Sequence, residues 1–136
     1  NAPFEDAVCA LYARFFPGLR RLATRSSEKG DTDLLAESPG GVIVRIQVKH
    51  FCPEKGEVQD WVVDQLAGSM ETGDHGIIVT TGTISKAARE KAEGMEGKSI
   101  TFIDGQEFVE HLFEAIDSMP KEALATFGIS YGIGFL

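Results

Sequence analysis

GDTDLLAESPGGVIVRIQVKH, residues 30–50, has the pattern of two short strands joined by a tight turn. In its second half apolar residues alternate with Arg45, Gln47 and Lys49. Successive side chains of a strand point to opposite faces, so alternation with a period of two separates these polar groups from the apolar ones. One face is therefore expected to lie in the core, while the other carries three polar groups in a row.

The turn decides which residues face each other across this hairpin. If residues 39–41, Pro-Gly-Gly, form a three-residue loop, Asp33 lies across from Gln47. A two-residue loop would instead set Asp33 against Ile46 in the core, where an unpaired carboxylate is costly. We therefore favour the three-residue loop. Because directly opposed residues share a face, it gathers four polar residues within reach of one another: Asp31, Asp33, Gln47 and Lys49.

Length and composition favour one domain over residues 1–136. The chain has 43% hydrophobic residues, and apolar positions are spread throughout, so it can bury a core of its own. No apolar run is long enough to cross a bilayer, and the start Asn1-Ala2-Pro3 is neither a signal peptide nor a natural beginning. We expect a cytoplasmic domain cut from a longer chain. Cys9 and Cys52 lack CxxC spacing, which favours free thiols over a disulfide.

The net charge of -8 taken alone argues against nucleic acid as a partner, because phosphate binding depends on Lys and Arg. The average hides an uneven distribution, since acidic residues predominate after residue 104. Local charge matters more than the total within a Debye length of about 10 Å. A basic edge on an acidic body is therefore open, formed by Arg14, Arg20, Arg21, Arg25 and Lys29.

The order of expected elements predicts an α/β fold with a mixed β-sheet flanked by helices. A first helix has Phe4, Val8, Leu11 and Phe15 on its inner side and stops at Pro17. After it we expect a strand over 19–24, the two hairpin strands, a helix over 58–70 with Trp61, Val62, Leu66 and Met70 inward, a strand over 76–81, a helix over 85–93, a strand over 99–103 and a helix over 106–117. The apolar, Gly-rich tail 127–136 is expected to form a strand or an interface.

The polar face of the hairpin has the parts needed for phosphodiester hydrolysis. A carboxylate and an amide oxygen can hold a hard divalent cation, and a lysine beside them can orient or deprotonate a water. The spacing of Asp33 from Gln47-Val48-Lys49 resembles the PD-(D/E)xK motif of restriction-endonuclease-like nucleases, and Gln in the middle position resembles the Mrr branch. The similarity extends over about residues 4–113, in the segments FEDAVCALYARF, LAGSM, GIIVTTGTISKAAREKA and ITFIDGQEFVEHL.

The resemblance implies an αβββαβ core and a Mg²⁺-dependent DNA endonuclease, with Mn²⁺ able to replace Mg²⁺. It makes Asp33 the main metal ligand and Gln47 a second ligand or a water-positioning residue. The carbonyl of Val48 would be a third ligand, and Glu5 matches the first-helix acid that can complete the metal shell. Lys49 would serve the attacking water or the scissile phosphate.

The same resemblance suggests how DNA is bound. Arg45 on the polar face, Arg21 and Arg25 on the basic edge, and Thr81 in the turn after a buried strand are expected DNA contacts. Cleavage of both strands implies a homodimer, and a further DNA-recognition domain is expected outside this chain. One departure from the family is Asp31, where a Gly-Gly pair usually precedes the motif. Its carboxylate could pair with Lys49 or assist a second metal.

Simpler interpretations stay open. Asp33 and Lys49 could form an ordinary cross-strand ion pair, and Glu5 could be a solvated surface carboxylate. The main alternative function is a catalytically inactive nuclease-fold module that binds DNA or a protein partner. A phosphate-sensing signalling domain leaves Gln47 and Lys49 unexplained.

The remaining histidines and the tryptophan suggest no further site. Zinc at His50 and Cys52 is disfavoured for lack of a second ligand pair. We expect three residues in purely structural positions: His75 in a loop, His111 on a helix surface and Trp61 in the core.

Overall fold

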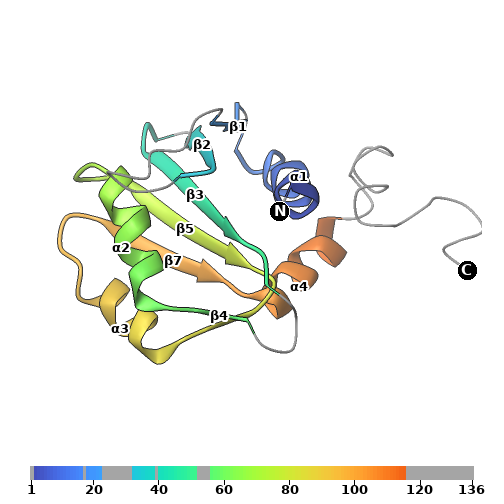
Figure 1. Cartoon of the computed structure of the whole chain (residues 1–136). Helices are drawn as coiled ribbons and strands as arrows, with labels where there is room; N and C mark the ends of the chain where they lie inside the picture. Colours follow the sequence, from blue (N-terminus) through green and yellow to red (C-terminus); the bar gives the residue numbers. More distant parts are fainter. Residues whose placement is uncertain (1, 17, 23–31, 39, 52–55, 116–136) are drawn as a thin grey trace, which may run out of the picture.

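Figure 1 shows the computed structural model of the chain, which describes residues 2–16, 18–22, 32–38, 40–51 and 56–115. The elements are α1 (Ala2–Tyr12), β1 (Arg20–Arg21), β2 (Leu34–Glu37), β3 (Ile43–Lys49), β4 (Glu57–Val58), α2 (Asp60–Ser69), β5 (His75–Thr80), β6 (Thr83–Ile84), α3 (Lys86–Glu93), β7 (Ser99–Ile103) and α4 (Gly105–Ala115).

The main sheet has five strands in the order β1-β2-β3-β5-β7. Strands β1, β2 and β3 are antiparallel neighbours, whereas β5 runs parallel to β3 and β7 runs parallel to β5. This confirms the predicted mixed sheet and αβββαβ core. A second, two-stranded sheet pairs β4 with β6 and was not predicted. Val58, expected to begin a helix, lies in β4, and α2 begins at Asp60.

The hairpin of β2 and β3 has the three-residue register expected from the sequence. Leu34 pairs with Ile46 and Ala36 pairs with Val44, and all four side chains are buried. Gly41 ends the loop with φ 84°, a left-handed conformation that glycine adopts without strain. The register therefore directs the apolar residues of both strands to one face of the sheet.

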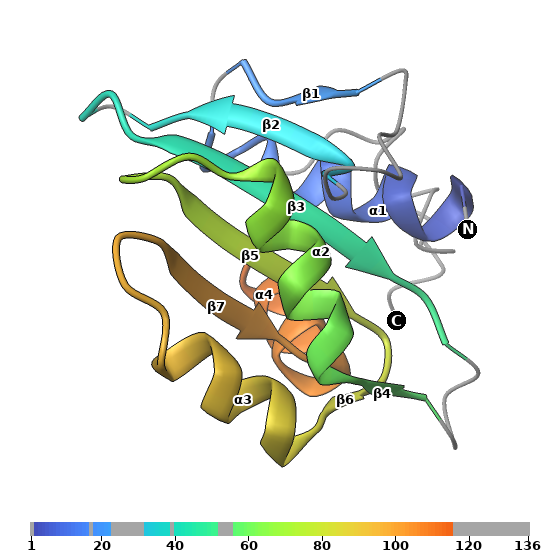
Figure 2. The same ribbon diagram turned by 60° about the vertical axis from the view of Figure 1, so that its left-hand side comes forward.

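Figure 2 shows that α2 and α3 lie in front of the sheet, while α1 and α4 lie behind it. Each face has its own hydrophobic core. The core toward α1 and α4 contains Ala7, Val8, Leu11, Tyr12, Leu34, Val44, Ile46, Ile77, Val79, Phe108 and Ala115. The core toward α2 and α3 contains Val58, Val62, Val63, Leu66, Met70, Ile78, Ala88 and Ile100.

Two aromatic residues do not lie where the sequence placed them. Trp61 was expected in the core, but 53% of it is exposed, because the buried face of α2 runs through Val62, Val63 and Leu66. Phe15 was expected on the inner side of the first helix and is also 53% exposed. Helix α1 ends at Tyr12, whose carbonyl accepts the N–H groups of both Phe15 and Phe16 in a turn.

The remaining boundaries follow the predictions with small shifts. β7 has the predicted bounds, β5 both starts and ends one residue earlier than predicted, and Ser85 caps α3 by accepting the N–H of Ala88 at 3.0 Å. Of the strand expected over 19–24, only Arg20–Arg21 is extended, and residues 23 and 24 lie outside the described part. Residues 116 and 117 of the last helix and the whole tail 127–136 also lie outside it. In the described part no helix is long and apolar enough to span a bilayer.

Gly76 in β5 allows α2 to pack closely against the sheet. A Cβ at this position would come within 2.8 Å of a methyl carbon of Leu66 and of the sulfur of Met70. We expect Gly76→Ala to lower the free energy of unfolding by about 1–3 kcal/mol, the usual cost of overpacking a core. Urea unfolding would measure this. Gly40→Ala is the matched control, because its Cβ would meet no atom within 4 Å, and equal stability of the two variants would contradict the close packing.

Candidate active site

Asp33 lies at the start of β2 and spans the backbone on either side of Gln47. Its N–H donates to the carbonyl of Ile46 at 2.9 Å, and its carboxylate oxygen Oδ2 accepts the N–H of Val48 at 2.7 Å. The regular ladder ends one pair earlier, at Leu34 and Ile46. The sequence predicted that Asp33 and Gln47 would be directly opposed in the ladder. Asp33 instead lies just before the ladder begins and bonds to the residues on either side of Gln47.

The backbone of Val48 is directed to the same edge of β3 as the Asp33 carboxylate. In a strand the N–H and C=O of one residue point to the same side, and neighbouring residues alternate between sides. The N–H of Val48 points to Asp33, whereas the carbonyl of Lys49 accepts the N–H of Thr81 beyond β5, at 3.3 Å. The carbonyl of Val48 is thus on the Asp33 side of β3.

Gln47 is fully buried, at 0% exposure, beneath α2. Its amide nitrogen Nε2 donates to Oε1 of Gln65 in α2 at 3.2 Å. Asp33 is only 5% exposed, so this part of the polar face is covered by the protein. Burial strengthens electrostatic interactions because the surroundings are less polarisable than water.

Lys49 shares the face of Gln47, since the two are two residues apart in β3. Its ammonium group Nζ lies 5.3 Å from the centre of the Trp61 ring, within the range of a cation–π contact. Because Trp61 is exposed, this contact holds the lysine ammonium group at the outer rim of this face, near solvent.

Glu5 approaches the same end of β3 from the opposite face of the sheet. It lies in the first turn of α1 and is 8% exposed, so it is not the solvated surface carboxylate considered above. The ring of the preceding residue, Phe4, is 5.6 Å from the ring of His50, which directly follows β3. The start of α1 is thus placed near the end of β3, where the sequence analysis expected Glu5 to complete the metal shell.

The metal ligands expected from the sequence offer the hard oxygen donors that Mg²⁺ prefers. They are the carboxylates of Asp33 and Glu5, the amide of Gln47 and the carbonyl of Val48. Among the described residues no three His, Cys, Asp or Glu side chains converge on a metal position. The predicted set contains only two carboxylates, so it would depend on the amide, the carbonyl and water to complete a shell.

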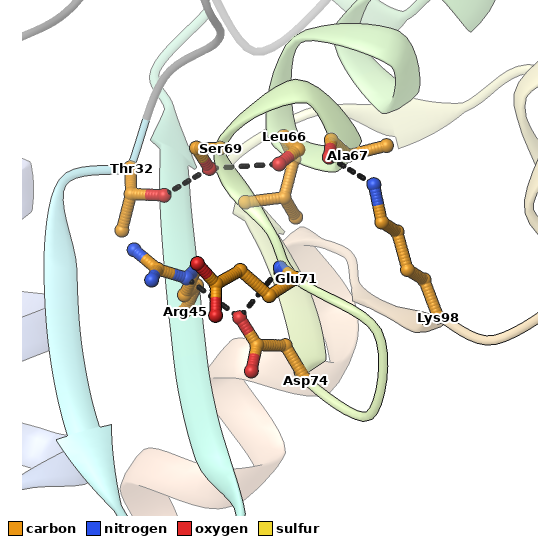
Figure 3. Close-up of polar contacts among 8 residues, drawn as sticks. All are labelled: Thr32, Arg45, Leu66, Ala67, Ser69, Glu71, Asp74 and Lys98. Atoms are coloured by element: carbon orange, nitrogen blue, oxygen red, sulfur yellow. Dashed lines mark hydrogen bonds and ion pairs between the residues drawn. The ribbon is translucent and has the colours of Figure 1, made fainter.

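Arg45, expected to contact DNA, is engaged at the other end of the sheet (Figure 3). Its Nε donates to the Asp74 carboxylate at 3.0 Å, and the same carboxylate oxygen accepts the N–H of Glu71 at 2.9 Å. Side-chain exposure is only 22% for Arg45 and 9% for Asp74. This geometry gives Arg45 a role in holding the turn before β5.

The other expected DNA contacts lie at the edges of the sheet or outside the described residues. Arg21 is exposed on β1 and forms an ion pair with Asp6 of α1. Arg25 and Asp31 lie outside the described part. The hydroxyl of Thr81 accepts the N–H of Phe51 at 2.8 Å and donates to its carbonyl at 3.1 Å. Thr81 therefore ties the turn after β5 to the chain that leaves β3.

The cysteine and histidine expectations have mixed outcomes. Cys9 is a free thiol, and burial raises its pKa, which keeps it protonated. Cys52 lies outside the described residues, so the zinc alternative stays untested. His75 begins β5 and is not in a loop. His111 is half-buried in α4, and its Nδ1 is 2.7 Å from the hydroxyl of Tyr12, whose pKa is raised by burial.

The restriction endonuclease family model for the Mrr catalytic domain matches residues 2–112. The chain belongs to the Mrr restriction endonuclease family. No curated protein sequence matches it. The chain spans about a third of the length of two of the solved structures that it matches.

Three solved restriction enzymes share the fold of this Mrr-family chain. The MspJI restriction endonuclease, in complex with a 27-mer oligonucleotide, has a TM-score of 0.61 and 21% identity, covering 97% of this chain and 33% of that one. The DNA modification-dependent restriction endonuclease AspBHI has a TM-score of 0.64 and 21% identity, and the match covers 92% of this chain and 34% of that one. The ATP-dependent Type ISP restriction-modification enzyme LlaBIII bound to DNA has a TM-score of 0.57 and 22% identity. The match covers 77% of this chain and 7% of that one.

Three residues of α2 that contact the site were missed in the sequence. Trp61 was predicted to lie in the core, and neither Gln65 nor Ser69 was predicted to belong to the site. The available signal was their spacing, because residues four apart lie on one face of a helix. Ser69 shares a hydrogen bond with Thr32, the neighbour of Asp33 (Figure 3).

We expect Arg45→Ala to lower stability by about 1–3 kcal/mol, because it leaves the buried Asp74 carboxylate without its charged donor. Urea unfolding measures the change. Lys86→Ala is the control, since the Lys86–Glu90 pair is 3.8 Å long and largely exposed, and such pairs contribute up to about 1 kcal/mol. Unchanged stability together with weaker DNA binding in Arg45→Ala would restore the original assignment of Arg45 to DNA.

Proposed function

We propose that this chain is the nuclease domain of a Mg²⁺-dependent DNA endonuclease that hydrolyses phosphodiester bonds, in restriction or another DNA-processing role. The observation that carries the proposal is the arrangement at the end of β3. The Asp33 carboxylate bonds to the N–H of Val48, Gln47 is held beside it, and Lys49 stands at the exposed rim. The family membership and the DNA-complexed neighbours support the same chemistry.

The residues that would hold the cation are Asp33, Gln47 and Glu5 together with the carbonyl of Val48. A bound divalent cation supplies stabilisation of negative charge at the phosphate and lowers the pKa of the attacking water. Lys49 would orient that water and donate hydrogen bonds to a non-bridging phosphate oxygen. The burial of Asp33 keeps bulk water away from its carboxylate, which strengthens its interaction with positive charge.

The partners and setting follow from this chemistry. DNA is the proposed substrate, and the exposed Arg14, Arg20 and Arg21 form the described part of a basic edge that would attract it. Cutting both strands needs two active sites, so we propose a homodimer. A cytoplasmic location and a separate DNA-recognition domain in the full protein belong to the same proposal.

We expect Lys49→Ala to abolish plasmid cleavage in Mg²⁺ while leaving DNA affinity within about threefold, since it removes only one of several positive charges near the DNA. Gel-shift binding and cleavage would be measured on the same preparation. Lys86→Ala removes an exposed charge on α3 and serves as the control for both measurements. Parallel loss of binding and cleavage in Lys49→Ala would contradict a role in the reaction.

We expect Asp33→Asn to abolish both cleavage and the rise in melting temperature caused by Mg²⁺, because a ligand that binds only the folded state stabilises it by mass action. The asparagine oxygen can still accept the N–H of Val48. The metal-free variant should therefore be as stable as wild type or more stable, by about 1 kcal/mol, since one buried charge is lost.

Asp64→Asn, on the exposed side of α2 where Asp64 pairs with Lys91, is the control and should keep both responses to Mg²⁺. An ion-pair role for Asp33 forecasts the reverse pattern, with lower stability of the variant and no effect of Mg²⁺ on either protein. Cleavage by wild type that persists in EDTA would also count against the cation. A DNA-binding module would bind DNA and cut it under neither condition.

A further inference from the structure

Helix α2 presents one row of side chains to the proposed catalytic residues. Trp61, Gln65 and Ser69 are spaced four residues apart, so they lie on one face in successive turns. Trp61 meets Lys49, Gln65 meets Gln47, and Ser69 meets Thr32, the neighbour of Asp33. Each turn of the helix thus contacts a different part of the site.

The contact of Gln65 with Gln47 fixes the direction of an unsymmetrical group. A carboxylate offers two equivalent oxygens to a cation, whereas an amide offers one oxygen and one NH₂ that repels positive charge. Here Nε2 of Gln47 is the end that bonds to Oε1 of Gln65, at 3.2 Å. The oxygen of the same planar amide is therefore directed away from Gln65.

The helix that carries Gln65 is itself held in place at several points. Ser69 shares a hydrogen bond with Thr32, just before β2, and the ammonium group of Lys98 donates to the carbonyl of Ala67 at 2.9 Å (Figure 3). Positive charge at this end also complements the helix dipole. A fixed helix keeps the acceptor of Gln65 at a constant distance from β3.

We propose that Gln65 is a positioning residue that orients the amide of Gln47, so that its oxygen faces the divalent cation. This inference rests on the proposed function and deepens it. It explains how Gln can occupy a position that would otherwise call for an acidic residue. Groups that orient metal ligands typically change metal affinity by about 10–100-fold when they are removed.

The test uses the full chain and two measurements, Mg²⁺ binding by calorimetry without DNA and the Mg²⁺ concentration that gives half-maximal plasmid cleavage. Gln65→Met keeps length and helix propensity but removes the acceptor, so we expect about tenfold weaker binding and a matching rise in half-saturation. Gln65→Glu keeps an acceptor and should retain at least wild-type affinity. Gln106→Met, an exposed Gln on α4 that bonds only to Glu110 among the contacts described, should change neither.

A second pair of variants separates orientation from packing. In a Gln47→Glu background both oxygens can face a cation, so adding Gln65→Met should weaken Mg²⁺ binding by less than about threefold.

If Gln65→Met does not fold, Gln65→Asn takes its place, because its acceptor is one methylene too short to reach Gln47. The KM for DNA should stay near the wild-type value in all Gln65 variants, since Gln65 acts through Gln47.

Two results would overturn the inference while leaving the proposed function in place. One is Mg²⁺ binding in folded Gln65→Met that equals wild type, and the other is an equal loss in Gln65→Met and Gln65→Glu. A wild-type chain that neither binds Mg²⁺ nor cleaves plasmid would overturn the proposed function and the inference together.

Discussion

Strand β3 is hydrogen-bonded along both edges, antiparallel to β2 and parallel to β5, and these two pairings fix the face to which every one of its side chains points. Val44 and Ile46 are placed in the core toward α1 and α4, while Arg45, Gln47 and Lys49 are placed toward α2. A slip of one residue would exchange the two sets. It would bury three polar groups in an apolar core, so the energy of the core and the geometry of the site depend on the same register.

Placing the site under α2 has a cost that the local contacts offset. Buried polar groups destabilise a fold unless they are hydrogen-bonded. Asp33 accepts a backbone N–H of β3 and Gln47 donates to Gln65. These bonds allow a carboxylate and an amide to be buried beside an apolar core. Ile78, the residue of β5 that pairs with Gln47, belongs to that core. The hydrogen bond from Gln47 to Gln65 of α2 is thus one of the contacts that allow the polar site to be buried.

Much of this could be predicted from the sequence because the signals were local. The register followed from period-two alternation and from Gly40-Gly41, and β7 was predicted with its observed bounds. The errors arose where position depends on distant residues. Trp61 was assigned to the core from its hydrophobicity, although the face of α2 that is buried depends on where the sheet meets it. The Gln47–Gln65 bond joins residues 18 apart in sequence, and the sequence around either residue does not predict that it contacts the other.

Arg45 and Lys49 show how the fold separates two basic residues that look alike in sequence. Both lie on the same face of β3, four residues apart. The parallel register sets Arg45 beside Gly76 and Lys49 beside Thr80, so Arg45 lies near Asp74, at the start of β5, and Lys49 lies where both strands end. In α/β sheets ligands bind beyond the carboxyl ends of parallel strands, where loops diverge and backbone groups are accessible. The position of Asp74 in the chain therefore decides that Arg45 stabilises the turn, while Lys49 lies at the end of the strands where the proposed DNA substrate would bind.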